Sequence, residues 1–185
     1  MSMLANIAVG LLESASIAKG IESADAMCKM ASVQLARAGV IARGKYVILI
    51  TGPVGEVESS LRAGRQMLGH DLVDEVLIRN IHAQVLETLD KRAPVKELDA
   101  VGIIETKDAV ATVLAADAAA KAAAVRLIET RILVGGGKGY VTMTGEVGAV
   151  RSAVAAGISA VPEAALVCHV IIPQANAQLL ETVGR

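Results

Sequence analysis

Apolar positions along this chain change between short continuous runs and helix-like spacing, and the change predicts successive elements. An apolar run at 6–12 has the length of a buried strand, and Ser16 after it is a residue type that caps helices. We expect a helix from that cap to about Met30. Its core face is expected at the positions that recur at helical spacing, Ile17, Ile21, Ala24 and Cys28.

The following segments complete a compact unit. Two β-rich runs, 33–41 and 46–51, are expected to pair as a hairpin around a tight Gly-Lys turn. A second helix at 54–68 leads to a strand at 73–78, and a short helix at 83–89 closes the unit. The order β-α-β-β-α-β predicts an α/β fold of the α+β type, a ferredoxin-like two-layer sandwich with its helices on one sheet face.

The whole pattern then occurs a second time. Matched segments, first copy then second, are VGLLE at 9–13 and VGIIE at 101–105, ADAMCK at 24–29 and ADAAAK at 116–121, GK at 44–45 and 137–138, TGPVG at 51–55 and TGEVG at 144–148, and AQVLET at 83–88 and AQLLET at 177–182. Such self-similarity at a nearly constant spacing is the mark of a repeated domain. We therefore expect one domain at 1–90, a second at 100–185, and a polar, proline-containing linker at 91–99.

Composition excludes several functions. Hydrophobic residues make up 54% of the chain but aromatic residues only 1%, so the core must be built from small aliphatic side chains. The lack of Phe and Trp argues against a base-stacking platform, and a net charge of −1 without a basic block gives no support for a nucleic-acid-binding face. Charge this close to zero favours self-association.

Targeting and cysteine chemistry add little. No signal peptide opens the chain and charges interrupt every apolar run before membrane-spanning length, so we expect a cytoplasmic protein without membrane contact. Two cysteines, Cys28 and Cys168, do not make a disulfide framework, and both are expected to be small buried hydrophobic residues.

No catalytic constellation is visible. The histidines His70, His82 and His169 fall at unrelated places, and Gly135–Lys138 lacks the spacing of a phosphate-binding loop. Glu13 and Glu105 recur at strand ends and could be an acid–base pair, or could satisfy nearby backbone or subunit contacts. Their repetition favours the structural interpretation, so we expect no catalytic residue and no enzymatic activity.

Taken together, the VGxxE strand end, the ADAxxK helix, the Gly-Lys hairpin and the TGxVGxV helix start resemble the bacterial microcompartment (BMC) shell-protein domain. The resemblance covers both copies and is greatest for tandem-domain shell proteins of the propanediol-utilisation type. It implies a pseudohexameric homotrimer in the shell of a cytoplasmic microcompartment, tiled edge to edge with other hexagonal shell proteins. It also implies a central pore for small polar or anionic metabolites.

Within this resemblance, the two hairpin loops lie near the symmetry axis. The pore-lining candidates are Ile41, Ala42, Arg43, Gly44, Val134, Gly135, Gly136 and Gly137. From the residues alone, the favoured interpretation is that both loops are tight β-turns that need positive φ. Three copies of Arg43 around an axis would favour anions. In related tandem shell proteins, the resemblance implies a cysteine in the first loop, three copies of which hold an iron–sulfur cluster on the axis. Ala42 stands at this position here, so neither this cluster nor another metal is expected.

The resemblance also marks a tile edge, whose candidates are Lys29, Lys121, Asn80, His82 and Gln174. Each lysine could instead be a solvated charge at a helix end, and His82 a helix-start residue rather than a ligand. Asn80 and Gln174 replace the arginine usual at this edge. Two other functions remain open, a trimeric small-molecule sensor and a metal or redox carrier on the axis.

Overall fold

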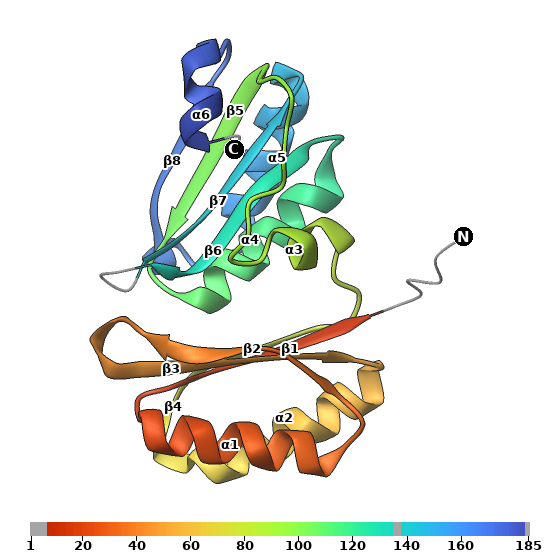
Figure 1. Ribbon diagram of the computed structural model, residues 1–185, viewed down its shortest axis with the longest axis vertical. Coiled ribbons are helices and arrows are strands. Elements are labelled where there is room, and N and C mark those ends of the chain that lie inside the picture. Colours follow the sequence, from red (N-terminus) through yellow and green to blue (C-terminus); the bar gives the residue numbers. More distant parts are fainter. Residues whose placement is uncertain (1–6, 135–137, 184–185) are drawn as a thin grey trace. The chain divides into compact units, whose positions relative to one another are not determined.

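The computed structural model describes residues 7–134 and 138–183 of the 185-residue chain. Contacts divide the chain into two compact units, with the boundary between Ile81 and His82 (Figure 1). Among the described residues, no helix is long and apolar enough to cross a bilayer.

The first unit is a four-stranded antiparallel sheet with two helices packed on one face (Figure 1). Its strands run in the spatial order β2-β3-β1-β4, which is the ferredoxin-like arrangement predicted from the sequence. The elements are β1 (Ala8–Ser14), α1 (Ile17–Met30), β2 (Gln34–Ile41), β3 (Lys45–Gly52), α2 (Val54–Leu68) and β4 (Leu72–Ile78).

The second unit repeats this arrangement, with strand order β6-β7-β5-β8. Its register is the same as in the first unit: Val9 pairs with Thr51, and the equivalent Val101 pairs with Thr144. The elements are α3 (Ala83–Thr88), β5 (Ala100–Thr106), α4 (Ala109–Ala122), β6 (Arg126–Val134), β7 (Lys138–Gly145), α5 (Val147–Ser159), β8 (Leu166–Ile172), a 3-10 turn (Ala177–Leu179) and α6 (Leu180–Val183). The internal repeat is thus a structural repeat.

Helix α3 closes the first repeat in sequence but lies in the second unit. Two of its side chains, Val85 and Thr88, are buried there, and the helix contacts β6 and α4. The sequence places 83–89 with the first domain because its pattern repeats at 177–182, and a repeat pattern carries no information about which sheet a short helix covers.

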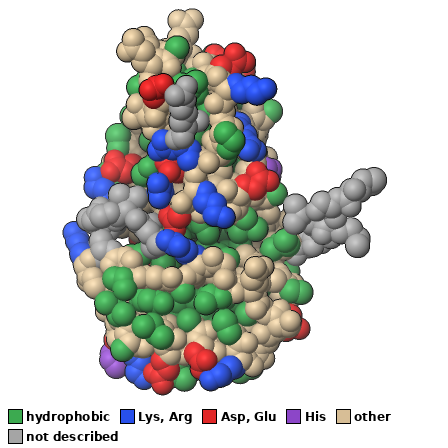
Figure 2. Space-filling view, viewed as in Figure 1, with side chains coloured by type: hydrophobic (Ala, Val, Ile, Leu, Met, Phe, Trp, Pro, Cys, Tyr) green, Lys and Arg blue, Asp and Glu red, His purple; other side chains and the backbone are tan. Residues whose placement is uncertain are grey.

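The predicted core face of α1 is wrong except for Ala24. The structure buries Gly20, Ser23, Ala24 and Met27, whereas Ile17 and Ile21 are 37% and 54% exposed. The Ser23 hydroxyl donates a hydrogen bond to the backbone oxygen of Gly64 on α2 at 3.1 Å, so the two helices approach closely through small residues. The larger side chains are turned outward, and hydrophobic side chains gather on the surface of the first unit (Figure 2).

The prediction that both cysteines are buried is also wrong, since Cys28 and Cys168 are exposed. The first lies on the outward side of α1 once that helix turns Ala24 and Met27 inward. The second lies on β8, an edge strand of its sheet, where only one neighbouring strand covers it.

One contact between helix and sheet is built in opposite ways in the two units. In the first, α1 carries Gly20 and β3 carries Tyr46, and a Cβ atom on Gly20 would lie 2.6 Å from that of Tyr46. At the equivalent positions of the second unit, α4 carries Thr112 and β7 carries Gly139, where a Cβ atom would lie 2.0 Å from the Thr112 hydroxyl oxygen. One large and one small residue fill the space in each case, as close packing of an interior requires.

This packing makes Gly20→Ala destabilising. A methyl group would overlap the Tyr46 side chain, and overpacking of this kind costs about 1–3 kcal/mol of unfolding free energy. The matched control is Gly55→Ala on α2, where an added Cβ meets no described atom within 4 Å, and stability should hold or rise by about 0.4–1 kcal/mol. Urea unfolding followed by circular dichroism measures both, and equal midpoints for the two variants would contradict the packing argument.

Candidate functional site: the hairpin loops

The first hairpin loop is a 3-10 turn of residues Ala42–Gly44 between β2 and β3. Gly44 has a φ of 74°, and Arg43 before it has a φ of 64°, so both occupy the left-handed region. The positive φ expected from the sequence is therefore present. A non-glycine residue pays about 1–2 kcal/mol in that conformation, so the turn holds the exposed Arg43 side chain at the tip at a conformational cost.

The second hairpin loop is described only at its ends. Val134 ends β6 and Lys138 begins β7. The candidates Gly135, Gly136 and Gly137 lie outside the described residues.

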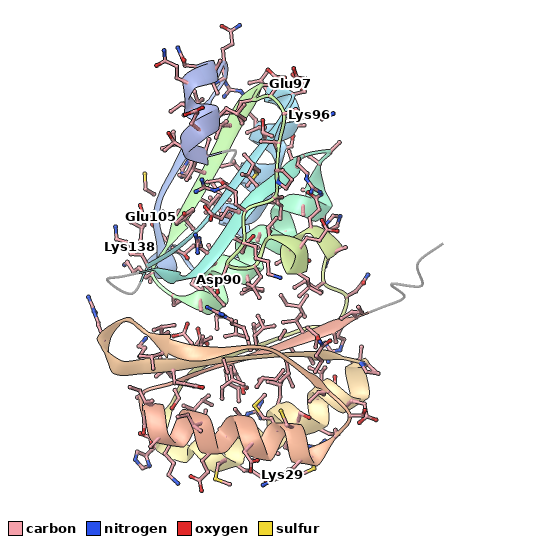
Figure 3. All side chains as sticks on the ribbon, in the orientation of Figure 1. Lys29, Asp90, Lys96, Glu97, Glu105 and Lys138 are labelled. Atoms are coloured by element: carbon pink, nitrogen blue, oxygen red, sulfur yellow. The ribbon has the colours of Figure 1, made fainter. Side chains whose placement is uncertain are left out.

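The base of each hairpin is tied to the central strand by a lysine–glutamate ion pair. The ammonium group of Lys45 lies 3.4 Å from the Glu13 carboxylate. That of Lys138 lies 2.6 Å from the Glu105 carboxylate, and Figure 3 labels this second pair. The Glu13 side chain is 1% exposed and that of Glu105 is 34% exposed. Each of the repeated glutamates thus pairs with one of the repeated lysines, which agrees with the structural interpretation.

A charged cluster near the second hairpin was missed by sequence reasoning. Glu129 on β6 is 1% exposed, and its carboxylate accepts hydrogen bonds from the Tyr140 hydroxyl at 2.8 Å, from Arg131 at 2.7 Å and from Arg92 of the linker at 3.2 Å. Burial alone would raise the pKa of Glu129, but these three donors outweigh it and hold the pKa below its usual value. The cluster fastens the linker to β6.

The tile-edge lysines are each paired on their own helix. Lys29 lies 2.5 Å from Asp25, and Lys121 lies 2.5 Å from Asp117 (Figure 3 labels Lys29). Asp117 also accepts a hydrogen bond from the backbone N–H of His82 at 2.7 Å. These contacts agree with solvated helix-end charges and do not test the edge role.

The other edge candidates lie at the ends of strands. His82 is the N-cap of α3, where its Nδ1 accepts a hydrogen bond from the Gln84 N–H at 3.4 Å, so its interpretation as a helix-start residue is confirmed. Asn80 follows β4 and Gln174 follows β8, and both are exposed.

Metal chemistry does not fit the residues present. No group of three or more His, Cys, Asp or Glu side chains within 7–134 and 138–183 is arranged to hold a metal ion. Ala42 has no ligand atom, and the two thiols lie on α1 and β8. The iron–sulfur cluster carried by relatives with a loop cysteine therefore has no ligand set here.

Comparison with known proteins decides between the remaining functions. The BMC domain family matches residues 8–81 and again residues 100–175. This chain belongs to the BMC domain family. The bacterial microcompartment shell protein PduT of Citrobacter freundii is 40% identical over 169 residues, which cover 90% of this chain and 92% of PduT.

Other shell and microcompartment proteins match one half or nearly all of this chain. The carboxysome shell protein CsoS1C of Halothiobacillus neapolitanus is 33% identical over 94 residues, covering 49% of this chain and 96% of its own length. A microcompartment protein of Desulfitobacterium hafniense superposes with a TM-score of 0.89 at 44% identity, over 96% of this chain and 99% of that one. A fused, permuted hexameric shell protein of the RMM microcompartment shares the fold, with a TM-score of 0.68 at 23% identity over 86% of this chain and 85% of its own.

These findings confirm the resemblance seen in the sequence. The protein is a structural component of a bacterial microcompartment shell and not an enzyme. Neither the sensor nor the redox carrier receives support from the comparisons.

The Glu129 cluster makes a pH-dependent contribution to stability. Because the folded-state pKa is lowered, this contribution is present above the usual glutamate pKa of 4.5 and is lost as the pH falls through the folded-state value. Glu129→Gln should lower the unfolding free energy by about 1.5–3 kcal/mol at pH 7, since it removes hydrogen bonds to a charged acceptor. The difference from the wild type should shrink below about pH 4.5.

The matched control is Glu105→Gln, which removes a partly exposed ion pair in the same unit and should cost about 0–1 kcal/mol. Thermal unfolding at a series of pH values measures both variants. A Glu129→Gln penalty that stays constant down to pH 3 would contradict the assignment.

Proposed function

We propose that three copies of this shell protein close into a ring of six BMC domains around a central pore. Two domains of the same fold and register in one chain give six similar sectors from three chains. A head-to-tail contact repeated around an axis closes when its rotation fits. The near-zero net charge of −1 sets little repulsion against such assembly.

The ring tiles with other hexagonal shell proteins along its outer edge. Lys29, Lys121 and His82 are proposed to contact neighbouring tiles, together with Asn80 and Gln174. The last two are uncharged amides where the family usually has an arginine. A neutral side-chain amide makes weaker polar contacts than a charged, bidentate guanidinium group does. This edge should therefore bind a neighbouring tile less tightly than an edge with the arginine.

The pore is proposed to be lined by 41–44 and 134–137 and to favour small anionic or polar metabolites. The observation that carries this is Arg43, an exposed cation held at the hairpin tip by a left-handed turn whose base is tied down through Lys45 and Glu13. Three such guanidinium groups around one axis attract carboxylates and phosphates and repel cations.

Arg43→Ala should therefore lower the ratio of anion to cation permeability by about tenfold, because it removes the fixed positive charge from the opening. Arg43→Lys should keep most of the preference. The measurement is the reversal potential of single channels under a salt gradient in planar bilayers.

The control is Arg151→Ala, which removes an exposed arginine from α5 and should leave the reversal potential unchanged. An Arg43→Ala pore with wild-type selectivity would show that another group sets the charge preference.

A further inference from the structure

Helix α3 and the residues next to it are held on the second unit by hydrogen bonds to the β6 region and to α4. The side-chain amide of Gln84 makes two hydrogen bonds to the backbone of the β6 region, donating to the Val125 oxygen at 3.1 Å and accepting from the Leu127 N–H at 2.8 Å. The backbone N–H of His82 is accepted by Asp117 on α4 at 2.7 Å. Val85 is 1% exposed between these polar contacts.

The chain after α3 then follows the edge of β6. The N–H of Asp90 donates to the Thr130 oxygen at 2.8 Å, and that of Ala93 donates to the Ile128 oxygen at 2.7 Å (Figure 3 labels Asp90). Strand β6 would otherwise be an edge strand with open backbone groups, which proteins normally cover. In this unit the covering segment is 82–93.

The first unit shows the same face exposed. Leu35 on β2 is 43% exposed and Val40 is 55% exposed, whereas their equivalents Leu127 and Ile132 are 0% and 3% exposed. The equivalence follows from register, because Leu35 pairs with Ile50 of β3 as Leu127 pairs with Met143 of β7.

Helix α1 extends this exposed face. Its Ile17 and Ile21 are exposed, whereas the equivalent Ala109 and Val113 of α4 are 2% and 0% exposed. Of the seven large hydrophobic residues exposed among the described ones, five lie on α1 and β2: Ile17, Ile21, Met30, Leu35 and Val40. Met30 lies on the opposite side of α1 from Ile21, so the exposed face is formed by the other four. Hydrophobic side chains gather on the surface of the first unit (Figure 2), and a patch of this kind marks an interaction surface.

The chain also contains a second copy of the covering segment. Residues 177–182 read AQLLET where α3 reads AQVLET, and they too are helical. Asn176 caps them by accepting a hydrogen bond from the Gln178 N–H at 2.9 Å, as His82 does for Gln84. Gln178 is exposed and no residue of this segment is buried.

We propose that residues 176–183 of one copy dock on the α1–β2 face of the first unit of the next copy. This rests on the proposed ring and names the contact that closes it. The Gln178 amide takes the place of Gln84, bonding the backbone oxygen of Val33 and the N–H of Leu35. Leu179 takes the buried place of Val85.

The polar contact on the helix is reproduced as well. The N–H of Asn176 donates a hydrogen bond to the carboxylate of Asp25, which is equivalent to Asp117. Lys29 forms an ion pair with Asp25, as Lys121 does with Asp117. The main targets on β2 are backbone groups. The contact therefore tolerates the change from Thr130 in the second unit to Ala38 in the first.

Leu179→Asp tests the docking directly. A carboxylate in the place of a buried side chain should weaken trimer association by about 100-fold, because its desolvation is uncompensated. The residue is not buried in the single chain, so the circular dichroism spectrum should be that of the wild type. The matched control is Glu181→Ala in the same segment, whose equivalent Glu87 stays exposed beside β6; it should keep the wild-type trimer.

Sedimentation equilibrium on the full chain gives the masses. A wild-type trimer together with a monomeric, folded Leu179→Asp variant supports the docking. A Leu179→Asp variant that remains as trimeric as the wild type overturns the docking and leaves the ring standing. A monomeric wild type overturns the ring itself.

A disulfide cross-link checks the register. Leu89 bridges Thr130 in the second unit, and the equivalent residues are Val183 and Ala38. Ala38→Cys with Val183→Cys, in a chain with Cys28→Ser and Cys168→Ser, should give covalent trimers on a non-reducing gel. The control pair Val73→Cys with Val183→Cys joins the same segment to the opposite sheet edge and should stay uncross-linked. Monomers only in the first pair, or equal cross-linking in both, would contradict the proposed register.

Discussion

A sheet edge has to be covered, and in this protein one segment of chain does that for one edge and leaves an equal edge open. Strand β6 receives α3 and the linker through hydrogen bonds to the backbone at Val125, Leu127, Ile128 and Thr130. Strand β2 has the same position in its sheet without such a cover in the described chain. Another strand or helix can bind to an uncovered edge. The fold of one chain therefore already presents a binding site for a neighbour.

The layers behind that edge depend on small residues. Glycine, serine and alanine lie at the α1–α2 contact and along α4, so the helices approach each other and the sheet closely. This close approach also explains the exposed large side chains of α1, since its inner face has no room for them.

Local patterns were sufficient for the elements. The helix expected at 54–68 has those bounds in the structure, and β-α-β-β-α-β with its duplication follows from hydrophobic spacing and turn residues alone. The face of α1 was not predictable, because apolar spacing favours the largest side chains while close approach at Gly20 and Gly64 selects the smallest. Cys28 was misplaced for the same reason, whereas Cys168 lies on the edge strand β8.

Contacts between residues far apart in the chain could not be predicted from the sequence. Nothing near Glu129 indicates that Arg92 reaches it, since 37 residues separate them and the linker reads only as polar. The family resemblance located the hairpin loops, and the turn at Arg43 agrees with it.

The opposite filling of the contact at Gly20 and Tyr46, and at Thr112 and Gly139, has a consequence for how the two halves can change. A protein with a single domain must accept every substitution in each of its copies. A fused chain can change one domain and leave the other alone, so the larger side chain can lie on the sheet in one domain and on the helix in the other. The two domains differ in this way, so a hairpin moved from one domain to the other would fit only if the helix that packs against it were moved as well. Two copies of one architecture are no longer interchangeable parts.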